Sequence, residues 1–246
     1  MKADPFRQLR LLDLQAIDTR LDQIAHARTR VPQLAELAQL STRSTALDSD
    51  LVRSETALGD VQREVAKSEA DVQLVRDRAA RDQARLDVGT GTAKDLQAIQ
   101  HELQSLARRQ SELEDIELEV MERAETLEGE VSRLRAERAE LDEHIRHVTA
   151  ARDAALAELD GEAANVAAPR VDVAAEVGDE LLALYEKIRA SSGGTGAAAL
   201  RQRRCGGCQL ELNPVEIGRI RSAPSDEVLR CEECRRILVR TPESGL

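Results

Sequence analysis

The chain has 246 residues, of which 33% are charged, and it contains no Trp, one Phe and one Tyr. So few aromatic residues exclude an ordinary large globular core, because aromatic side chains bury the most area per residue, and the charged composition is typical of long helices and coiled coils. A formal net charge of −11 excludes attraction to nucleic acid by the charge of the chain as a whole.

The chain carries no recognisable export or membrane signal. No apolar run approaches the length of a membrane span, and residues 1–10 lack an apolar core followed by a small-residue cleavage site. We therefore expect no signal peptide and no membrane contact. Four cysteines without an export signal indicate free thiols in the reducing cytoplasm.

The first long helical segment is expected to begin at Asp4 and Pro5, a cap residue followed by proline at the first helical position. Apolar residues then recur at alternating spacings of three and four, which predicts a coiled-coil seam as far as Leu86. Pro32 interrupts this pattern and its ring clashes with the carbonyl of Arg28. We expect a kink there, with the helix continuing beyond it.

A glycine- and threonine-rich stretch at 88–92 predicts a turn, and Thr92 can cap the helix that follows. A second seam runs from Leu96 to Leu159 with the same alternation. Because a short turn places neighbouring helices antiparallel, we expect an intrachain coiled-coil hairpin over 1–165 and a monomer. The alternative is a parallel dimer in which each helix pairs with its copy.

The next segment, 166–196, is expected to consist of a linker and one short helix. Residues 166–173 include Ala-Ala-Pro and predict the linker, whereas 179–189 form an amphipathic helical pattern. Tyr185 in that helix is interpreted as a packing anchor against the base of the hairpin. Residues 191–196, rich in serine and glycine, predict a flexible turn.

Four cysteines near the C-terminus form two C-x-x-C pairs, Cys205 with Cys208 and Cys231 with Cys234. Two such pairs supply four thiolates, the closed ligand set of one structural Zn²⁺ with no open position for catalysis. The alternatives are two disulfides, which would suit a small secreted domain, or a redox C-x-x-C, which would require a thioredoxin-like βαβ context.

The 22 residues between the two pairs suit a zinc ribbon, so 197–246 are expected to form a small C-terminal β zinc-ribbon domain. Asn213 and Pro214 predict the start of a short helix that ends near Ile220. We expect strands at 198–204 and 227–230 that lead into the two C-x-x-C turns, here called knuckles, and strands at 209–212 and 236–240 that lead out of them. Residues 241–246 are expected to be frayed.

Three stretches of the chain, 94–103, 181–189 and 205–238, resemble the bacterial family of coiled-coil hairpin proteins with a C-terminal four-cysteine zinc ribbon. The resemblance implies a chaperone-like or adaptor protein without enzymatic activity. Studied members are linked to flagellar or secretion gene control, to an alternative sigma factor and to RNA. The sequence departs from the family pattern at Gln209, where His is common, and at Arg235, where Gly is common.

The ribbon segment contains nine arginines, no lysine and seven acids. Arginine offers bidentate contacts to phosphate and carboxylate, and a metal knuckle presents its neighbours rigidly. We therefore expect ligand contact to centre on four arginines, with the predicted hairpin tip beginning at Lys94 as the competing site. The four arginines are Arg203, Arg204, Arg235 and Arg236.

Two functions follow from these patterns. The first is a non-enzymatic adaptor or chaperone-like protein that binds a protein partner, for which the resemblance suggests a sigma factor or a secretion-related protein. The second is a regulator that binds RNA or DNA through the arginine-rich ribbon. The absence of aromatic residues in the ribbon argues against sequence-specific recognition of single strands.

Overall fold

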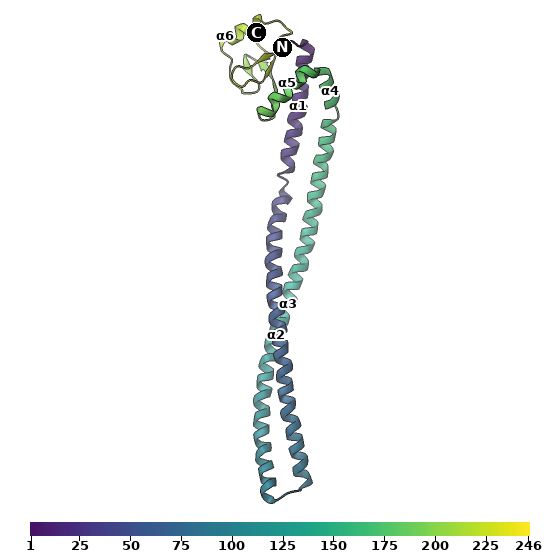
Figure 1. Ribbon diagram of the computed structural model, residues 1–246, viewed down its shortest axis with the longest axis vertical. Helices are drawn as coiled ribbons and strands as arrows, with labels where there is room; N and C mark the ends of the chain where they lie inside the picture. Colours follow the sequence, from purple (N-terminus) through teal and green to yellow (C-terminus); the bar gives the residue numbers. More distant parts are fainter. The chain divides into compact units, whose positions relative to one another are not determined.

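A computed structural model describes residues 1–246 (Figure 1). Its elements confirm the expected class, mainly helical with an antiparallel coiled-coil hairpin and a small C-terminal β region. The helices are α1 Pro5–Arg28, α2 Pro32–Val88, α3 Ala93–Ala167, α4 Arg170–Val177, α5 Asp179–Ser191 and α6 Pro214–Ser222. The strands are β1 Ala197–Arg201, β2 Arg204–Cys205, β3 Leu229–Arg230 and β4 Ile237–Val239.

The chain divides into two compact units. The coiled-coil unit is Ala35–Thr149, and the ribbon unit combines Met1–Leu34 with Ala150–Leu246. Helices α2 and α3 each supply residues to both units. None of the helices combines the length and the apolar character that crossing a membrane requires.

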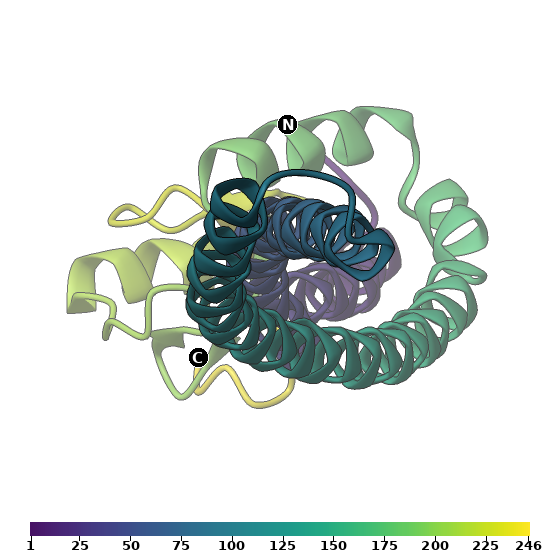
Figure 2. The same ribbon diagram turned by 90° about the horizontal axis from the view of Figure 1, so that it is seen from below.

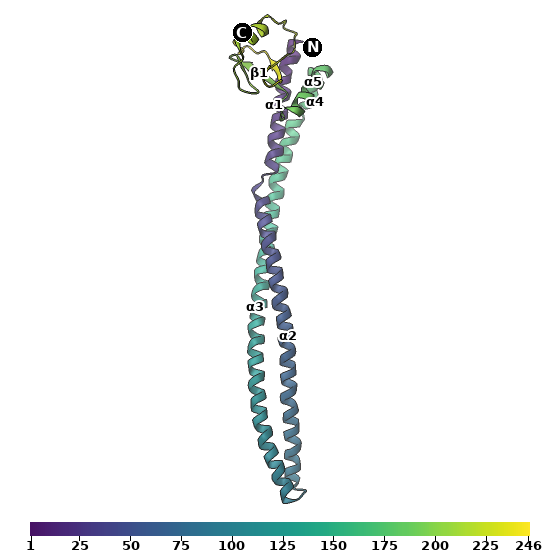
Figure 3. The same cartoon turned by 60° about the vertical axis from the view of Figure 1, so that its left-hand side comes forward.

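In the coiled-coil unit, α2 and α3 lie side by side and run antiparallel (Figures 1 and 3). Seam residues from the two helices pack in two clusters, and positions early in α2 meet positions late in α3. One cluster contains Leu40, Leu47, Leu134, Leu141 and Val148, and the other contains Val61, Val120 and Ala124. The heptad pattern thus pairs within one chain, because the seams of both helices are buried against each other.

Ion pairs along the flanks of the seam follow the same antiparallel order. Five of them link α2 to α3 at 2.6–2.8 Å, and they are Asp48–Arg138, Glu55–Arg135, Glu64–Arg123, Arg76–Glu114 and Arg78–Glu102. Most of these side chains are well exposed, so solvent screening keeps the contribution of each pair to stability small. Their main effect is on register, since a shift would place like charges opposite each other.

The connection between α2 and α3 occupies residues 89–92 (Figure 2). The N–H of Thr92 donates to Asp95 Oδ2 at 2.9 Å, and the N–H of Asp95 donates to Thr92 Oγ1 at 3.3 Å. This is a capping box with aspartate at the third position. The hydroxyl of Thr92 also donates to Asp95 Oδ2 at 2.7 Å, and this bond, together with the one from the Thr92 N–H, lowers the pKa of Asp95.

The helix is broken near Pro32, where we expected only a kink. Helix α1 ends at Arg28, and α2 starts afresh with Pro32 as its first residue. Thr29 closes α1, and its hydroxyl donates to the carbonyl of His26 at 2.8 Å. The expectation of a continuous helix is wrong because proline at a first helical position needs no N–H partner and has a favourable φ.

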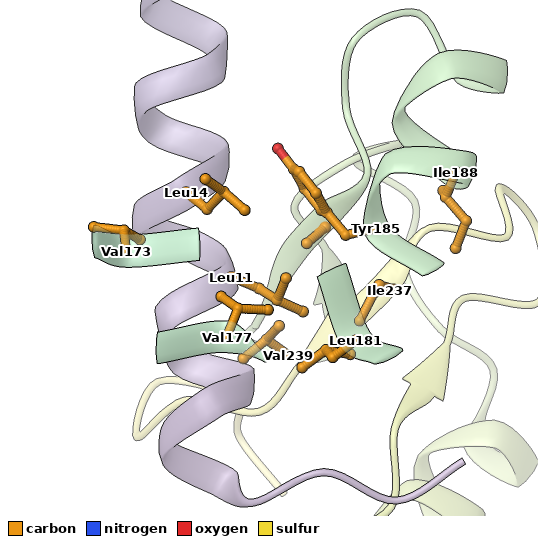
Figure 4. Packing of buried hydrophobic residues seen from close by; sticks show 10 residues of the cluster. Leu11, Leu14, Val173, Val177, Leu181, Tyr185, Ile188, Ile237 and Val239 are labelled. Carbon is orange, nitrogen blue, oxygen red and sulfur yellow. The ribbon is translucent and has the colours of Figure 1, made fainter. Parts of the chain in front are cut away.

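Helix α3 runs to Ala167 and residues 170–177 form α4, so the expectation of a linker over 166–173 is wrong except at 168–169. Val173 and Val177 of α4 are buried against Leu11 and Leu14 of α1 (Figure 4). The Ala-Ala-Pro sequence misled the prediction because Pro169 stands just before the helix, where its missing N–H costs nothing.

Helix α5 joins the same core. Leu181, Tyr185 and Ile188 are buried, as the amphipathic pattern predicted, and they pack with Ile237 and Val239 of β4 (Figure 4). Tyr185 is fully buried, which confirms its interpretation as a packing anchor. One apolar cluster therefore unites α1, α4, α5 and the sheet.

The sheet has the order β2-β1-β4-β3. Strands β1 and β4 are parallel, whereas the β1–β2 and β3–β4 pairs are antiparallel. A second core lies between this sheet, the knuckles and α6, and it includes Leu200, Leu212, Ile217, Ile220 and Leu229. Of the strand expected at 209–212, only an isolated bridge from Glu211 to Arg204 is present.

Both chain ends are tied to the ribbon. The hydroxyls of Thr241 and Ser244 each donate to the carbonyl of Leu200 at 3.1 Å, so the expectation of a frayed end over 241–246 is wrong. At the other end, the N–H of Ala3 donates to the carbonyl of Asp226 at 2.8 Å. Polar residues at a terminus suggest fraying, but here they satisfy backbone groups of the ribbon.

Candidate metal centre and arginine surface

The four cysteines converge on one point of the ribbon unit. Their sulfurs all lie within 4.8 Å of one another, with Cys205 and Cys234 Sγ atoms 3.8 Å apart and those of Cys208 and Cys231 4.0 Å apart. Four thiolates at the ordinary Zn–S distance would lie roughly 3.8 Å apart in a tetrahedron. The sulfurs are too far apart for disulfides, and the cysteines are free.

Each C-x-x-C pair forms the same backbone turn. The N–H of Gln209 donates to the carbonyl of Cys205 at 2.8 Å, and the N–H of Arg235 donates to that of Cys231 at 2.9 Å. The residue after each second cysteine has a left-handed backbone, with φ of 66° at Gln209 and 63° at Arg235. These two matching turns aim both sulfurs of each pair at the metal.

Without a metal, burial disfavours the thiolate form of two of the four cysteines. Burial raises the pKa of Cys205, and it raises the pKa of Cys231 to about 12. Zinc ligands are thiolates, so a bound Zn²⁺ must displace these protons. The affinity for zinc therefore decreases as the pH is lowered. The donor set fits one structural zinc ion, because four protein thiolates leave no open coordination position.

Glu216 supports the second knuckle and was missed by the sequence analysis. Its side chain is buried, and its Oε1 accepts a hydrogen bond from the N–H of Glu232 at 3.1 Å. Its own N–H donates to Oδ1 of the cap residue Asn213 at 2.8 Å. The sequence signal for Glu216 is only that of an ordinary acid in a first helical turn.

Three of the four predicted arginines are exposed on the ribbon, and they are Arg203, Arg204 and Arg235. Arg203 and Arg204 occupy the β1–β2 hairpin, where Arg203 has φ of 61°. Arg203 and Arg235 therefore both have left-handed backbones, which glycine adopts without strain and arginine does not.

Arg236 has a different role from the one predicted. It is half-buried, and its guanidinium donates to the carbonyls of Thr195 at 3.1 Å and Ser192 at 2.8 Å. These bonds attach the knuckle to the turn that follows α5. Lys94, the competing candidate, is exposed at the second residue of α3 in the coiled-coil unit.

A buried polar cluster at α1 also escaped the sequence analysis. Asp18 is only 2% exposed and accepts hydrogen bonds from Arg170 Nε at 2.7 Å and from Tyr185 Oη at 2.8 Å. Arg189 Nε lies 3.5 Å from the same carboxylate. The sequence offers no signal for this cluster, because Asp18 lies in α1 and its partners lie in α4 and α5.

Two family models match the chain. The CT398-like coiled coil hairpin domain matches residues 14–193, and the C4-type zinc ribbon domain matches residues 204–238. Neither is an enzyme family. An uncharacterized protein of Mycobacterium tuberculosis is 39% identical over 244 residues, which cover 98% of both chains. An uncharacterized protein of Mycobacterium leprae is 32% identical and covers 94% of this chain and 95% of its own.

Solved structures agree with this assignment. A protein from Mycobacterium smegmatis is 40% identical, with a TM-score of 0.87 over 98% of this chain and 100% of its own. CT398 from Chlamydia trachomatis is 16% identical, with a TM-score of 0.69 over 96% and 98% of the two chains, a likeness that shows the fold alone. The chain therefore belongs to the CT398-like coiled-coil hairpin family and carries its metal centre in a C4-type zinc ribbon.

Proposed function

We propose that this protein is a non-enzymatic adaptor that binds a protein partner through its zinc ribbon. The observation that carries the proposal is the placement of Arg203 and Arg235 at left-handed backbone positions, which an arginine occupies only at a cost. Both side chains, and that of Arg204, are exposed, and Arg203 Nε also donates to the carbonyl of Gly245 at 3.0 Å. Arg203 belongs to the β1–β2 hairpin turn and Arg235 to the second knuckle turn, so the fold holds both backbones and presents each charged side chain to solvent.

Rigid presentation makes these arginines suitable for binding. The knuckle turn holds Arg235, and the sheet holds Arg204, so little order has to be gained when a partner binds. Structural zinc with four thiolates supplies no open coordination position, which favours binding over catalysis. Free zinc-binding thiols suit the reducing cytoplasm, where we expect the protein to act.

The test is a capture experiment with a charge-matched control. The variant R203S/R204S/R235S loses three exposed ribbon arginines, whereas R53S/R63S/R109S loses three exposed arginines of the coiled coil. We expect the first variant to lose its partner from lysate and the control to retain it, at equal zinc content and helicity. Retention by the first variant, together with loss in K94S/H101S, would assign recognition to the residues after the α2–α3 turn.

Nucleic acid is the second candidate ligand, because arginine alone carries the positive charge of the ribbon segment and arginine binds phosphate in a bidentate manner. Binding of RNA and DNA should then fall steeply as salt rises, since each phosphate contact releases counterions. We expect no such binding at physiological salt from a chain with a net charge of −11. A steep salt slope that disappears in R203S/R204S/R235S would favour the nucleic-acid function.

A further inference from the structure

A cavity of about 570 Å³ in the ribbon unit lies between α1, β1 and the first knuckle. Figure 3 shows β1 beside α1. The lining contains Arg201 and Arg204, three glutamines, mostly small uncharged residues and the fully buried metal ligand Cys205. It contains no acid, although the chain has 46. Apart from the buried metal ligand Cys205, the charged side chains of this lining are all positive, which suits an anionic ligand.

The two arginines form a cross-strand pair. Arg201 and Arg204 stand directly opposite each other where β1 meets β2, so their side chains share one face of the sheet. Like charges at such positions repel. Each has one loose acidic neighbour, Glu243 at 3.4 Å and Glu211 at 3.8 Å, and all four side chains are at least 63% exposed. Such pairs are weak, so an entering carboxylate can replace them.

The turn that joins the two arginines is held in place from outside. Gln202 and Arg203 both have positive φ, 46° and 61°, the geometry of a two-residue hairpin that normally requires Asn-Gly. Their N–H groups donate to the carbonyls of Glu243 at 2.8 Å and Ser244 at 2.9 Å. The C-terminal residues thereby fix the arginine pair at the mouth of the cavity before any ligand arrives.

We infer that this cavity, the β1 groove, binds an acidic segment of a protein partner with its carboxylates at Arg201 and Arg204. The inference rests on the proposed adaptor function and moves the main contact from Arg235 to the β1 groove. Charge complementarity identifies the occupant. Small lining residues such as Ala16 and Ala199 accommodate short side chains between the acids, and no aromatic residue lines the groove for a base to stack on.

The test measures fluorescence anisotropy of a fluorescein-labelled peptide, Ala-Glu-Ala-Glu-Ala-Glu-Ala, with the full chain loaded with zinc. R201S/R204S should weaken binding by about tenfold or more, since charge-assisted hydrogen bonds are lost. The control R219S/R221S removes the same charge from α6, outside the groove, and should change affinity by less than about twofold. A peptide with Gln in place of Glu should not bind.

Mapping on the wild-type chain removes any dependence on how the variants fold. Addition of the Glu peptide should shift the backbone amide resonances of Ala199, Gly206 and Gln209, which line the groove. Unchanged affinity in R201S/R204S, equal losses in R219S/R221S, or shifts only elsewhere would overturn the inference. Binding of an oligo-dT strand at the groove with no binding of the peptide would overturn it in favour of nucleic acid.

The two proposals fail in different ways. If R203S/R204S/R235S loses its partner and the peptide does not bind wild-type protein, the adaptor function stands and the β1 groove is wrong. If partner capture survives in R203S/R235S and is lost in R201S/R204S, the groove stands and the surface of Arg203 and Arg235 is wrong. If neither the partner nor the peptide is bound, both proposals fail.

Discussion

Asp18 shows how one side chain can join separate helices. It belongs to α1, whereas its partners Arg170 and Tyr185 belong to α4 and α5. Burial alone would raise the pKa of Asp18, but the hydrogen bonds from these two residues outweigh burial and lower it below its ordinary value. Burial and the bond to Asp18 raise the pKa of Tyr185. Asp18 is therefore ionised at neutral pH and holds the helices together.

Asp18→Asn should destabilise the ribbon unit by about 3 kcal/mol, because it leaves the arginines beside a neutral amide in a buried site. Asp13→Asn is the matched control on the same helix, since Asp13 is exposed and pairs only with Arg10, and it should cost less than about 0.5 kcal/mol. Urea unfolding followed by fluorescence of Tyr185, the chain's one tyrosine, reports on this site directly. Equal effects of the two variants would contradict the role of Asp18.

The same change carries a pH signature. Because the folded pKa of Asp18 is lowered, its contribution is present above the ordinary carboxylate pKa and is lost as pH falls through the folded value. The stability difference between wild type and Asp18→Asn should be constant above about pH 5 and shrink below about pH 4. A difference that grows in acid would reverse the assigned sign.

At the scale of elements, the ribbon depends on two cores of different origin. One contains Ile237 and Val239 of β4 with residues of α1, α4 and α5, and needs no metal. The other contains Cys205 and Cys231 themselves, with apolar residues from β1, β3 and α6. Two of the metal ligands are thus part of the second core, so the folding of the knuckles and α6 should depend on bound zinc.

Removal of zinc with a chelator should unfold the knuckles and α6 and leave most of the helical content intact, because α1 to α5 pack without the metal. Hydrogen exchange should show lost protection at Ile217 and Ile220, with far-UV circular dichroism little changed. Cys231→Ser should have the same effect as chelation. Added zinc should restore protection in the chelated wild-type chain but not in Cys231→Ser. Elemental analysis that finds no zinc in freshly purified protein would contradict the metal centre.

At the scale of the whole molecule, the hairpin satisfies its own seams. Each long helix already has an antiparallel partner in the same chain, with Val61 packed against Val120 and Leu47 in one cluster with Leu141. A parallel pairing of each helix with its copy would compete for these same apolar positions. The fold therefore favours one chain over an interchain coiled coil.

We accordingly predict a monomer. Light scattering coupled to size-exclusion chromatography should give a mass near 27.1 kDa that does not change with protein concentration. A mass of twice this value that falls on dilution would instead indicate that the chain associates through surfaces other than the seams. Charge-reversed Glu64→Arg with Arg123→Glu should leave the mass unchanged, since that pair is formed within one chain.

Much of the fold could be predicted from the sequence because its signals are local or periodic. The coiled-coil seams follow a seven-residue repeat of apolar residues, which is visible in the sequence itself. Asp4 and Pro5 predict a helix start, and the Asp4 side chain accepts a hydrogen bond from the N–H of Phe6 at 2.8 Å. The zinc ligands were equally readable, since the C-x-x-C spacing of Cys205 and Cys208 is dictated by one tight turn.

Only the tertiary structure decided which polar side chains are committed and which are free. Arg236 and Arg235 are neighbours in the sequence, yet Arg236 bonds to carbonyls beyond α5 while Arg235 is exposed. Asp18 gains its role from residues more than 150 positions away, and Ser244 anchors the C-terminal residues on Leu200. These contacts leave no local pattern, because a buried polar group takes its partner from whatever segment the packing brings within hydrogen-bond distance.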